Sequence, residues 1–284
     1  MKIAVTAASG QFGRTLIRQL KVAEPEHELT GLARTPDKAA DLGIEIRPGD
    51  YDHKAQLEKS LAGIDVCILI SGMAPPDERI VQHTNVVQAA QTAGVRKILF
   101  TSIGSNASCG GFDPVVACMH DTEDVLRQSG MEWVVGRNGL YIEPDFDYRD
   151  TYAEAGAIEN CAGDRLCSYT SRAELARAYA ALIVDKRFNN KTFHLAGPGI
   201  TQAELAEAMN QVFGTSLVYK PMSVDDYIAS RVAEHGDFMG QIIAGIYVGI
   251  ANGAFELESD FEEIVGRPHK TAVEMAQEYL AQLS

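Results

Sequence analysis

The stretch Met1–Lys21, MKIAVTAASGQFGRTLIRQLK, decides the fold. A short apolar run (IAV) meets a loop of small residues, and a segment follows in which Leu16, Ile17 and Leu20 lie at helical spacing. A strand, a tight glycine-containing turn and a helix in this order are typical of a dinucleotide-binding turn, where the start of the helix faces the pyrophosphate. The stretch therefore predicts a phosphate-binding loop over Thr6–Gly13.

Two of the three glycines that such a turn uses are present. Gly10 has the position where a missing side chain lets the backbone approach the pyrophosphate, and Gly13 has the position that lets the helix pack closely on the strand. Ala7 replaces the first glycine, and its methyl group is tolerable only if the backbone stays out of the positive-φ region. A plain tight turn is the alternative, but the strand–helix alternation that follows favours cofactor binding.

Short apolar runs alternate with helical patterns along the first half of the chain. Such runs are typical of strands that are covered on both faces. They are Ile3–Thr6, Leu29–Ala33, Ile44–Arg47, Val66–Ile70, Ile98–Thr101 and Trp133–Val135. Helices are predicted between them, and two of these, Asp77–Ala93 and Val115–Ser129, end at Gly94 and Gly130. This alternation predicts an α/β fold with a Rossmann-type, doubly wound parallel sheet.

The pattern changes after about residue 138. The next predicted elements are a β-hairpin at Ala157–Tyr169, a helix at Arg172–Val184 and a sheet strand at Thr192–Leu195. From Thr201 onward the pattern is mainly helical. We therefore expect a Rossmann domain over residues 1–138 and a smaller, mainly helical substrate-side lobe over residues 139–284. Segments near 166–196 are expected to return to the main sheet.

Composition and charge argue against several classes of partner. The formal charge of −14 argues against a nucleic-acid backbone or an anionic membrane surface. No apolar run approaches the roughly 20 residues of a membrane span, and no signal peptide precedes the first strand. The five cysteines have no C-x-x-C spacing, so they indicate neither a zinc site nor a disulfide framework. We therefore expect a cytoplasmic protein without a metal.

A second cofactor signal lies at the end of the second predicted strand, in GLARTP (Gly31–Pro36). An NAD site normally has an acidic residue there for the ribose 2′-hydroxyl, whereas an arginine accommodates the 2′-phosphate of NADP. Arg34 stands at this position with no acidic residue beside it. The alternative is a solvated arginine, but a guanidinium at a strand end suits a phosphate dianion. The sequence therefore favours NADP(H) as the cofactor.

Several segments carry a resemblance to a known family. They are TAASGQFG, LARTPDKA, GDYDHKAQLEKSLAGIDVCILIS, HTNVVQAAQTAGVRKILFTS, the helix containing His120, and RNGLYIE. Their order and spacing resemble the NmrA-like atypical short-chain dehydrogenase/reductases. Within that family the chain is most similar to type 2 NADPH-dependent quinone oxidoreductases and triphenylmethane reductases. The resemblance implies a reductase that transfers a hydride from NADPH to a quinone or a similar conjugated acceptor.

The resemblance also implies the site residues, all at carboxyl ends of predicted strands, where open α/β sheets bind ligands. Those implied for the cofactor are Thr6, Ala8, Ser9, Gly10, Gln11, Phe12 and Gly13 at the pyrophosphate, Arg34 at the 2′-phosphate, Asp50 and Tyr51 near adenine, Ser71, Gly72 and Met73 near the nicotinamide ribose, Thr101 and Ser102 after the fifth strand, and Asn138, Gly139, Leu140 and Tyr141 at the nicotinamide ring. Those implied for catalysis are His120, Asn138 and Tyr141. Ala7 departs from the family's glycine.

The Tyr-x-x-x-Lys pair of ordinary short-chain dehydrogenases does not occur in the sequence. In that pair the lysine lowers the pKa of the tyrosine, which then relays a proton to a carbonyl. His120 and four polar residues occupy the corresponding helix, much as in the quinone-reductase relatives. A quinone depends less on a general acid, because water can protonate the hydroquinone oxygens. The protein would then mainly orient and shield the cofactor.

Some roles stay open in the sequence. His120 shares a helical stripe with Glu123 and Arg127, so a surface position competes with a catalytic one. The aromatic residues from Tyr141 to Tyr152 either form the core of the lobe or stack on a planar substrate. His83 has apolar neighbours at helical spacing, which favours a structural role.

Three functional classes also remain open. The first is the NADPH-dependent reductase, whose partner is a small aromatic or quinone-like molecule. The second is a non-catalytic NADP(H)-binding redox sensor of NmrA type, which acts on a regulatory protein partner. The third is an isomerase or epimerase, against which the missing tyrosine–lysine pair argues. A homodimer is compatible with each of them.

Overall fold

The computed structural model describes residues 1–283, which form two compact units. Unit 1 comprises residues 1–103, 117–138 and 172–193, and unit 2 comprises the rest of the described chain. Each unit thus takes several separate stretches of the sequence. The domain boundary expected after residue 138 stays a prediction.

Unit 1 is built on a seven-stranded sheet with the strand order β3-β2-β1-β4-β5-β6-β9. The strands are β1 (Lys2–Val5), β2 (Glu28–Ala33), β3 (Glu45–Pro48), β4 (Val66–Leu69), β5 (Lys97–Ile103), β6 (Glu132–Asn138) and β9 (Lys191–Leu195). The pairs that join β1 to β6 are parallel. After β3 the chain crosses back to β4 on the other side of β1, so the strand order reverses between β1 and β4. Open α/β sheets bind ligands at such a switch point, outside the carboxyl ends of the strands.

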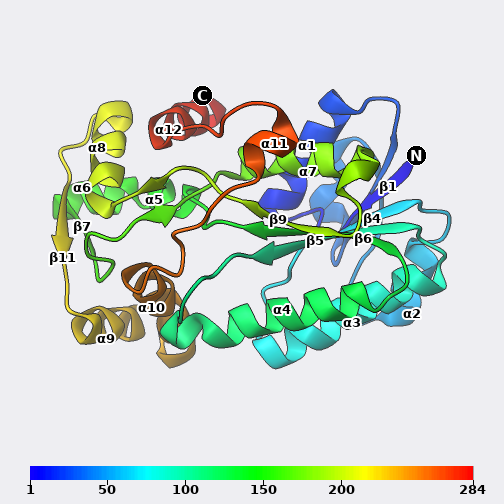
Figure 1. Ribbon diagram of the computed structural model, residues 1–284, viewed down its shortest axis with the longest axis horizontal. Coiled ribbons are helices and arrows are strands. Elements are labelled where there is room, and N and C mark those ends of the chain that lie inside the picture. Colours follow the sequence, from blue (N-terminus) through cyan, green and yellow to red (C-terminus); the bar gives the residue numbers. More distant parts are fainter. Residues whose placement is uncertain (284) are drawn as a thin grey trace. The chain divides into compact units, whose positions relative to one another are not determined.

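Helices cover both faces of this sheet. They are α1 (Gln11–Ala23), α2 (Lys54–Ser60), α3 (Pro76–Thr92), α4 (Asp113–Arg127) and α7 (Arg172–Val184). In Figure 1, α1 and α7 lie on one face, and α2, α3 and α4 lie on the other. Because helices cover it from both sides, β4 is buried at all four residues, as its apolar run predicts. The predicted Rossmann-type doubly wound sheet is confirmed.

Unit 2 is mainly helical and contains four short strands. Its elements are α5 (Glu143–Asp147), α6 (Arg149–Ala155), β7 (Ala157–Asn160), β8 (Cys167–Ser168), β10 (Gly199–Ile200), α8 (Gln202–Phe213), β11 (Val218–Pro221), α9 (Val224–His235), α10 (Asp237–Ala251), α11 (Phe261–Val265) and α12 (Ala272–Leu283). Within residues 1–283, no helix combines the length and the apolar character needed to cross a membrane.

The β-hairpin predicted over residues 157–169 is wrong. Its two strands form, but β7 pairs in parallel with β11 and β8 pairs antiparallel with β10. Gly163 has a φ of 63° and turns the chain as expected for a loop glycine. The turn was therefore visible in the sequence, whereas the distant partner strands were not.

Candidate functional site

The loop after β1 keeps the shape of a glycine-rich turn although alanine replaces its first glycine. Ala7 has a φ of 46°, in the left-handed region that the sequence argument expected an alanine to avoid. This conformation costs a residue with a side chain about 1 kcal/mol. The Ala7 carbonyl accepts a hydrogen bond from the Gly10 N–H at 2.9 Å, which closes the turn. The turn geometry therefore prevails over the local preference of alanine.

Gly10 and Gly13 both lie close to the Ala7 carbonyl group, and Gly13 is the closer of the two. A Cβ atom at Gly13 would lie 2.4 Å from the Ala7 carbonyl oxygen, so only glycine lets α1 start this near the loop. A Cβ atom at Gly10 would lie 3.2 Å from the same oxygen, which is a tight contact. Gly10 precedes α1 and caps it without a side-chain hydrogen bond. The first turn of α1 therefore offers backbone N–H groups and the positive end of a helix dipole to an anion.

Arg34 lies directly after β2, at the same edge of the sheet as the loop. The Ala8 N–H donates to the Leu32 carbonyl at 2.9 Å, which ties the loop to the end of this strand. Arg34 is exposed and has no hydrogen bond or ion pair within the described part of the chain. A guanidinium without a partner next to a phosphate-binding loop fits the 2′-phosphate of NADP.

Arg14 connects the loop to the segment that follows Arg34, and the sequence argument missed it. Its Nε donates to the Ser9 carbonyl at 3.2 Å, and Nη1 forms an ion pair with Asp41 at 2.7 Å. Its Nη2 also donates to the Lys38 carbonyl. An arginine four residues after Gly10, followed by an acidic residue in the next connection, was the available signal. Arg14 therefore ties the loop after β1 to the segment Lys38–Asp41 that follows Arg34.

Thr6 and Tyr51 are buried and bind each other. The Tyr51 hydroxyl lies 2.5 Å from Thr6 Oγ1 and 2.8 Å from the carbonyl oxygen of Ile70. Thr6 Oγ1 also accepts from the Ile70 N–H at 3.0 Å. These bonds join the carboxyl ends of β1 and β4 to the chain after β3. The neighbouring Asp50 is half-buried, so the adenine contact expected for this segment stays a prediction.

The segment after β4 is held by His83 of α3, which is fully buried. The Gly72 N–H donates to His83 Nε2 at 3.1 Å, and His83 Nδ1 lies 2.9 Å from Thr122 Oγ1. Because Thr122 gives its own proton to the Cys118 carbonyl, the imidazole carries its proton on Nδ1. Burial, with the nearby Arg79 charge, lowers the pKa of His83 to about 3, so this ring stays neutral. His83 therefore positions the predicted ribose-binding segment, beyond the structural role expected of it.

Other residues of this segment differ in exposure. Met73 is 86% exposed, while Ser71 is half-buried. The Ser71 N–H donates to Thr101 Oγ1 at 2.9 Å. This bond links the chain after β4 to the end of β5 and uses the Thr101 side chain within the unit.

Ser102 belongs to a buried charge network. Its hydroxyl donates to Glu123 at 2.7 Å, and the same carboxylate accepts two bonds from Arg137 at 2.8 and 2.9 Å. Arg127 binds it as well, at 2.7 Å. Although burial opposes it, these partners lower the pKa of Glu123. Glu123 is therefore buried against the sheet. The polar stripe with His120 and Arg127 had instead suggested a position near the solvent.

His120 lies one turn before this network on α4 and is half-buried. Its Nε2 atom is enclosed and has no hydrogen-bond partner within residues 1–283. An enclosed ring nitrogen in a folded protein normally has a hydrogen-bond partner, which can be a water molecule or a ligand atom. His120 is therefore less exposed than a surface residue, and its catalytic role stays a prediction.

The RNGLYIE segment begins at the end of β6. Asn138 is buried in unit 1, where its Oδ1 accepts from the Tyr179 hydroxyl at 3.0 Å. Gly139 begins the part in unit 2, and a Cβ atom there would lie 2.3 Å from the Ser168 carbonyl oxygen. Tyr141 is half-buried and bridges to Thr170. Backbone contacts thus hold the segment, and the contact with Ser168 leaves room only for glycine at position 139.

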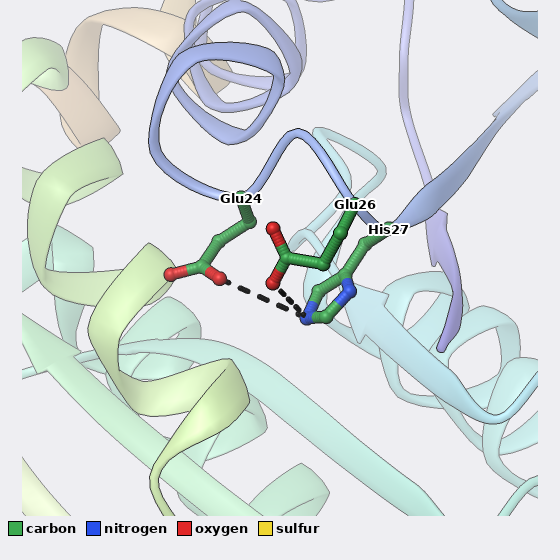
Figure 2. A group of neighbouring side chains, drawn as sticks. All are labelled: Glu24, Glu26 and His27. Atoms are coloured by element: carbon green, nitrogen blue, oxygen red, sulfur yellow. Dashed lines mark ion pairs between the residues drawn. The ribbon is translucent and has the colours of Figure 1, made fainter.

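One group of side chains in the described chain could approach a metal ion. Glu24, Glu26 and His27 lie between α1 and β2, with their ligand atoms within 4.8 Å of one another (Figure 2). His27 Nε2 is 3.7 Å from Glu24 and 3.5 Å from Glu26, so the three already form ion pairs. The group lies before β2, at the amino ends of the strands. It is therefore at the opposite edge of the sheet from the loop after β1.

Comparisons with known proteins agree with this geometry. Residues 7–186 match the NAD(P)H-binding family. Quinone oxidoreductase 2 of Escherichia coli strain K12 is 30% identical over 280 residues, which are 96% of each chain. The crystal structure of the NADPH-dependent quinone oxidoreductase QOR2 from E. coli, complexed with NADPH, has a TM-score of 0.88 and 29% identity, and the match covers 98% of this chain and 99% of that one.

A second solved structure is similar over its full length. The Citrobacter sp. triphenylmethane reductase complexed with NADP(H) has a TM-score of 0.87 and 31% identity, with coverage of 97% of this chain and 100% of that one. The loop after β1, the unpaired Arg34 and the family match all indicate the same ligand class. The chain is therefore a member of the NmrA-like NAD(P)H-binding family of oxidoreductases.

Proposed function

We propose that this chain transfers a hydride from NADPH to a quinone or a similar conjugated acceptor. The main support is its similarity, over nearly the full length, to a quinone oxidoreductase and a triphenylmethane reductase. The missing Tyr-x-x-x-Lys pair agrees with acceptors that take a hydride readily. Quinones and triarylmethane dyes are both conjugated and electron-poor.

The residues of unit 1 fit an NADP(H) molecule. The first turn of α1 and Gly10 would hold the pyrophosphate, and Arg34 would bind the 2′-phosphate. The Gly72 segment, fixed by His83, would bind the nicotinamide ribose. When bound, the cofactor supplies the hydride, and the protein supplies orientation and protection from water.

The acceptor would be held by the segment that starts at Asn138. Tyr179 holds the Asn138 amide, and the close contact of Gly139 with Ser168 fixes the backbone that follows. Tyr141 comes two residues later and is half-buried. An aromatic ring of this kind can stack on a planar acceptor.

An assay of NADPH consumption with a panel of quinones, a triarylmethane dye and an enone tests the proposal. A parallel titration compares the binding of NADP⁺ with that of NADPH. Turnover with at least one acceptor is the expected result. Protein that binds NADPH but reduces none of them would instead be a redox sensor.

Arg34→Ala should weaken NADPH binding by ten-fold to a hundred-fold and change NADH binding little. The expected loss corresponds to about 1.5–3 kcal/mol for a hydrogen bond to a charged group, and only NADPH carries the 2′-phosphate. Fluorescence titration with both cofactors measures it. Arg18→Ala removes another exposed arginine, from α1, and serves as the control. Equal losses for NADPH and NADH would contradict the assignment of Arg34.

Tyr141→Ala should raise the KM for a bulky quinone by roughly ten-fold, with a smaller effect on NADPH binding. The ring would contact the acceptor, and loss of an aromatic contact of about 1 kcal/mol and its buried area accounts for the change. Steady-state kinetics with saturating NADPH measures the KM. Tyr141→Phe keeps the ring and should stay close to the wild type. A loss confined to NADPH affinity would place this side chain on the cofactor instead.

A further inference from the structure

Unit 2 contains a buried carboxyl group that the cofactor site does not use. Asp145 of α5 is only 3% exposed. Its Oδ1 accepts from the Tyr152 hydroxyl of α6 at 3.0 Å and from the Tyr247 hydroxyl of α10 at 3.2 Å. The Tyr169 hydroxyl, after β8, also lies near this carboxyl group and accepts from the Gln202 amide at 3.0 Å. Three tyrosines from three parts of the chain thus surround one carboxyl group, and we call this set the Asp145 cluster.

No basic side chain is paired with Asp145 within residues 1–283. The other titratable groups near enough to sense its charge are Tyr227 of α9 and Cys167 of β8, which are also neutral when protonated. A buried carboxylate without a cation favours its protonated form. Burial raises the pKa of Asp145 to about 6, despite the opposing effect of the tyrosine hydrogen bonds. Near neutral pH this group can therefore both hold and release a proton.

The Asp145 cluster lies next to the predicted acceptor segment. Thr170 pairs with both sides of Tyr141, because its N–H donates to the Leu140 carbonyl at 2.8 Å and its carbonyl accepts from the Ile142 N–H at 2.9 Å. Tyr169, which lies near Asp145, is the residue just before Thr170. Asp145 itself is four residues after Tyr141, in the helix α5 that follows the bridge. The bridge joins Tyr141 to Thr170. One member of the cluster, Asp145, follows Tyr141 in the chain, and another, Tyr169, directly precedes Thr170.

The members of the cluster differ in burial. Asp145 and Tyr169 are buried, whereas Tyr152 and Tyr247 are partly exposed. The hydroxyls of Tyr152 and Tyr247 both lie within hydrogen-bond distance of the same carboxylate oxygen. A proton can thus pass between Asp145 and a molecule in contact with Tyr152 or Tyr247 by way of one phenol.

We propose that Asp145, acting through the hydroxyls of Tyr152 and Tyr247, supplies the proton that completes the reduction of a quinone. This inference rests on the proposed function and assigns the proton donor that the missing tyrosine–lysine pair leaves open. Water remains the competing donor, and the experiment below separates the two.

A quinone that receives a hydride gains two electrons and one proton and becomes a hydroquinone anion. A phenol proton from Tyr152 or Tyr247 moves to the anionic oxygen and forms an O–H bond. The carboxyl proton of Asp145 moves to that tyrosine oxygen and leaves a carboxylate, which regains a proton from solvent. The net reaction consumes one proton from water per quinone.

Two acceptors distinguish a proton donor from a structural group. A quinone needs the proton, whereas a cationic triarylmethane dye becomes neutral when it takes up a hydride and needs none. Asp145→Asn should lower the ratio of quinone turnover to dye turnover at least ten-fold at pH 6. Asp147→Asn, two residues later, removes an exposed carboxylate that also accepts a tyrosine hydroxyl, and should leave this ratio within two-fold. In the wild type, quinone turnover should fall above pH 6, while dye turnover should not.

A readout without turnover comes from infrared difference spectra of the cofactor-free protein. The carbonyl stretch of a protonated carboxyl group should be present in the wild type at pH 5, decrease towards pH 8 and be missing from Asp145→Asn. A ratio of quinone turnover to dye turnover that stays unchanged in this variant, even when both activities fall, would overturn the inference. If Asp145→Asn does not fold, Tyr247→Phe combined with Tyr152→Phe removes both hydroxyls and must lower the same ratio. A wild type that reduces neither acceptor refutes the proposed function itself.

Discussion

Gly10→Val should abolish NADPH binding, with an affinity at least a hundred-fold below that of the wild type. A Cβ atom at this position already meets the Ala7 carbonyl oxygen at 3.2 Å, and the branched Cγ atoms of valine extend beyond it. They would occupy the space in front of the first turn of α1, where the backbone N–H groups face the pyrophosphate. A hundred-fold loss corresponds to about 2.7 kcal/mol. Isothermal titration of the purified variant measures it.

Ala7→Gly is the matched control in the same turn. Because Ala7 has a φ of 46°, glycine should relieve about 1 kcal/mol of backbone strain and keep or tighten NADPH binding. Thermal unfolding of both variants shows whether the loop change affects folding. A folded Gly10→Val protein that binds NADPH normally would show that the loop after β1 does not hold the pyrophosphate.

The central sheet could be predicted because its signals are local. Each buried strand is a short apolar run, and the helices between them end at glycines such as Gly94 and Gly130, whose φ values are 78° and 75°. Alternation of strands and helices then permits few topologies other than a parallel sheet. The loop, the strand ends and the predicted cofactor residues follow from that order.

Features that depend on distant partners could not be predicted. The strands β7 and β8 looked like the two halves of a hairpin, but each pairs with a strand much later in the chain. The sequence pattern placed Glu123 on the polar side of a helix. In the fold it is buried, because Arg137 balances its charge and Ser102 donates a hydrogen bond to it. Both errors arise because a short window of sequence shows the pattern of a segment and not its partner.

The Asp145 cluster illustrates the same limit in the candidate site. Asp145 follows Glu143 and Pro144, so it resembles an acidic residue in the exposed first turn of a helix. Its tyrosine partner on α10 is 102 residues away in sequence. The sequence contains each member, but only the fold brings a carboxyl group and three phenols together.

The difference in unfolding free energy between Asp145→Asn and the wild type should favour the variant more at pH 7 than at pH 4. The pKa of Asp145 is raised to about 6 on folding, so between this value and about 3.9 the folded chain binds more protons than the unfolded chain. The free energy of unfolding of the wild type therefore decreases as the pH rises through this window. Below both pKa values, the protonated Asp145 stabilises the fold by about 3 kcal/mol relative to high pH. Almost all of this stabilisation is lost by pH 7.

Asparagine does not ionise, so the variant does not lose unfolding free energy at this position as the pH rises. Its side chain has the same size as that of aspartate. Its amide oxygen can accept a tyrosine hydroxyl, so the cluster keeps part of its hydrogen bonding. Urea unfolding of both proteins at pH 4, 5, 6 and 7 gives the difference in unfolding free energy, which should shift in favour of the variant by about 2 kcal/mol over this range. Asp147→Asn alters an exposed carboxyl group of the same helix and should stay within about 0.5 kcal/mol of the wild type, as surface substitutions do. A difference between wild type and Asp145→Asn that does not change with pH would mean that Asp145 stays ionised in the fold, and it could then hold no proton for the acceptor.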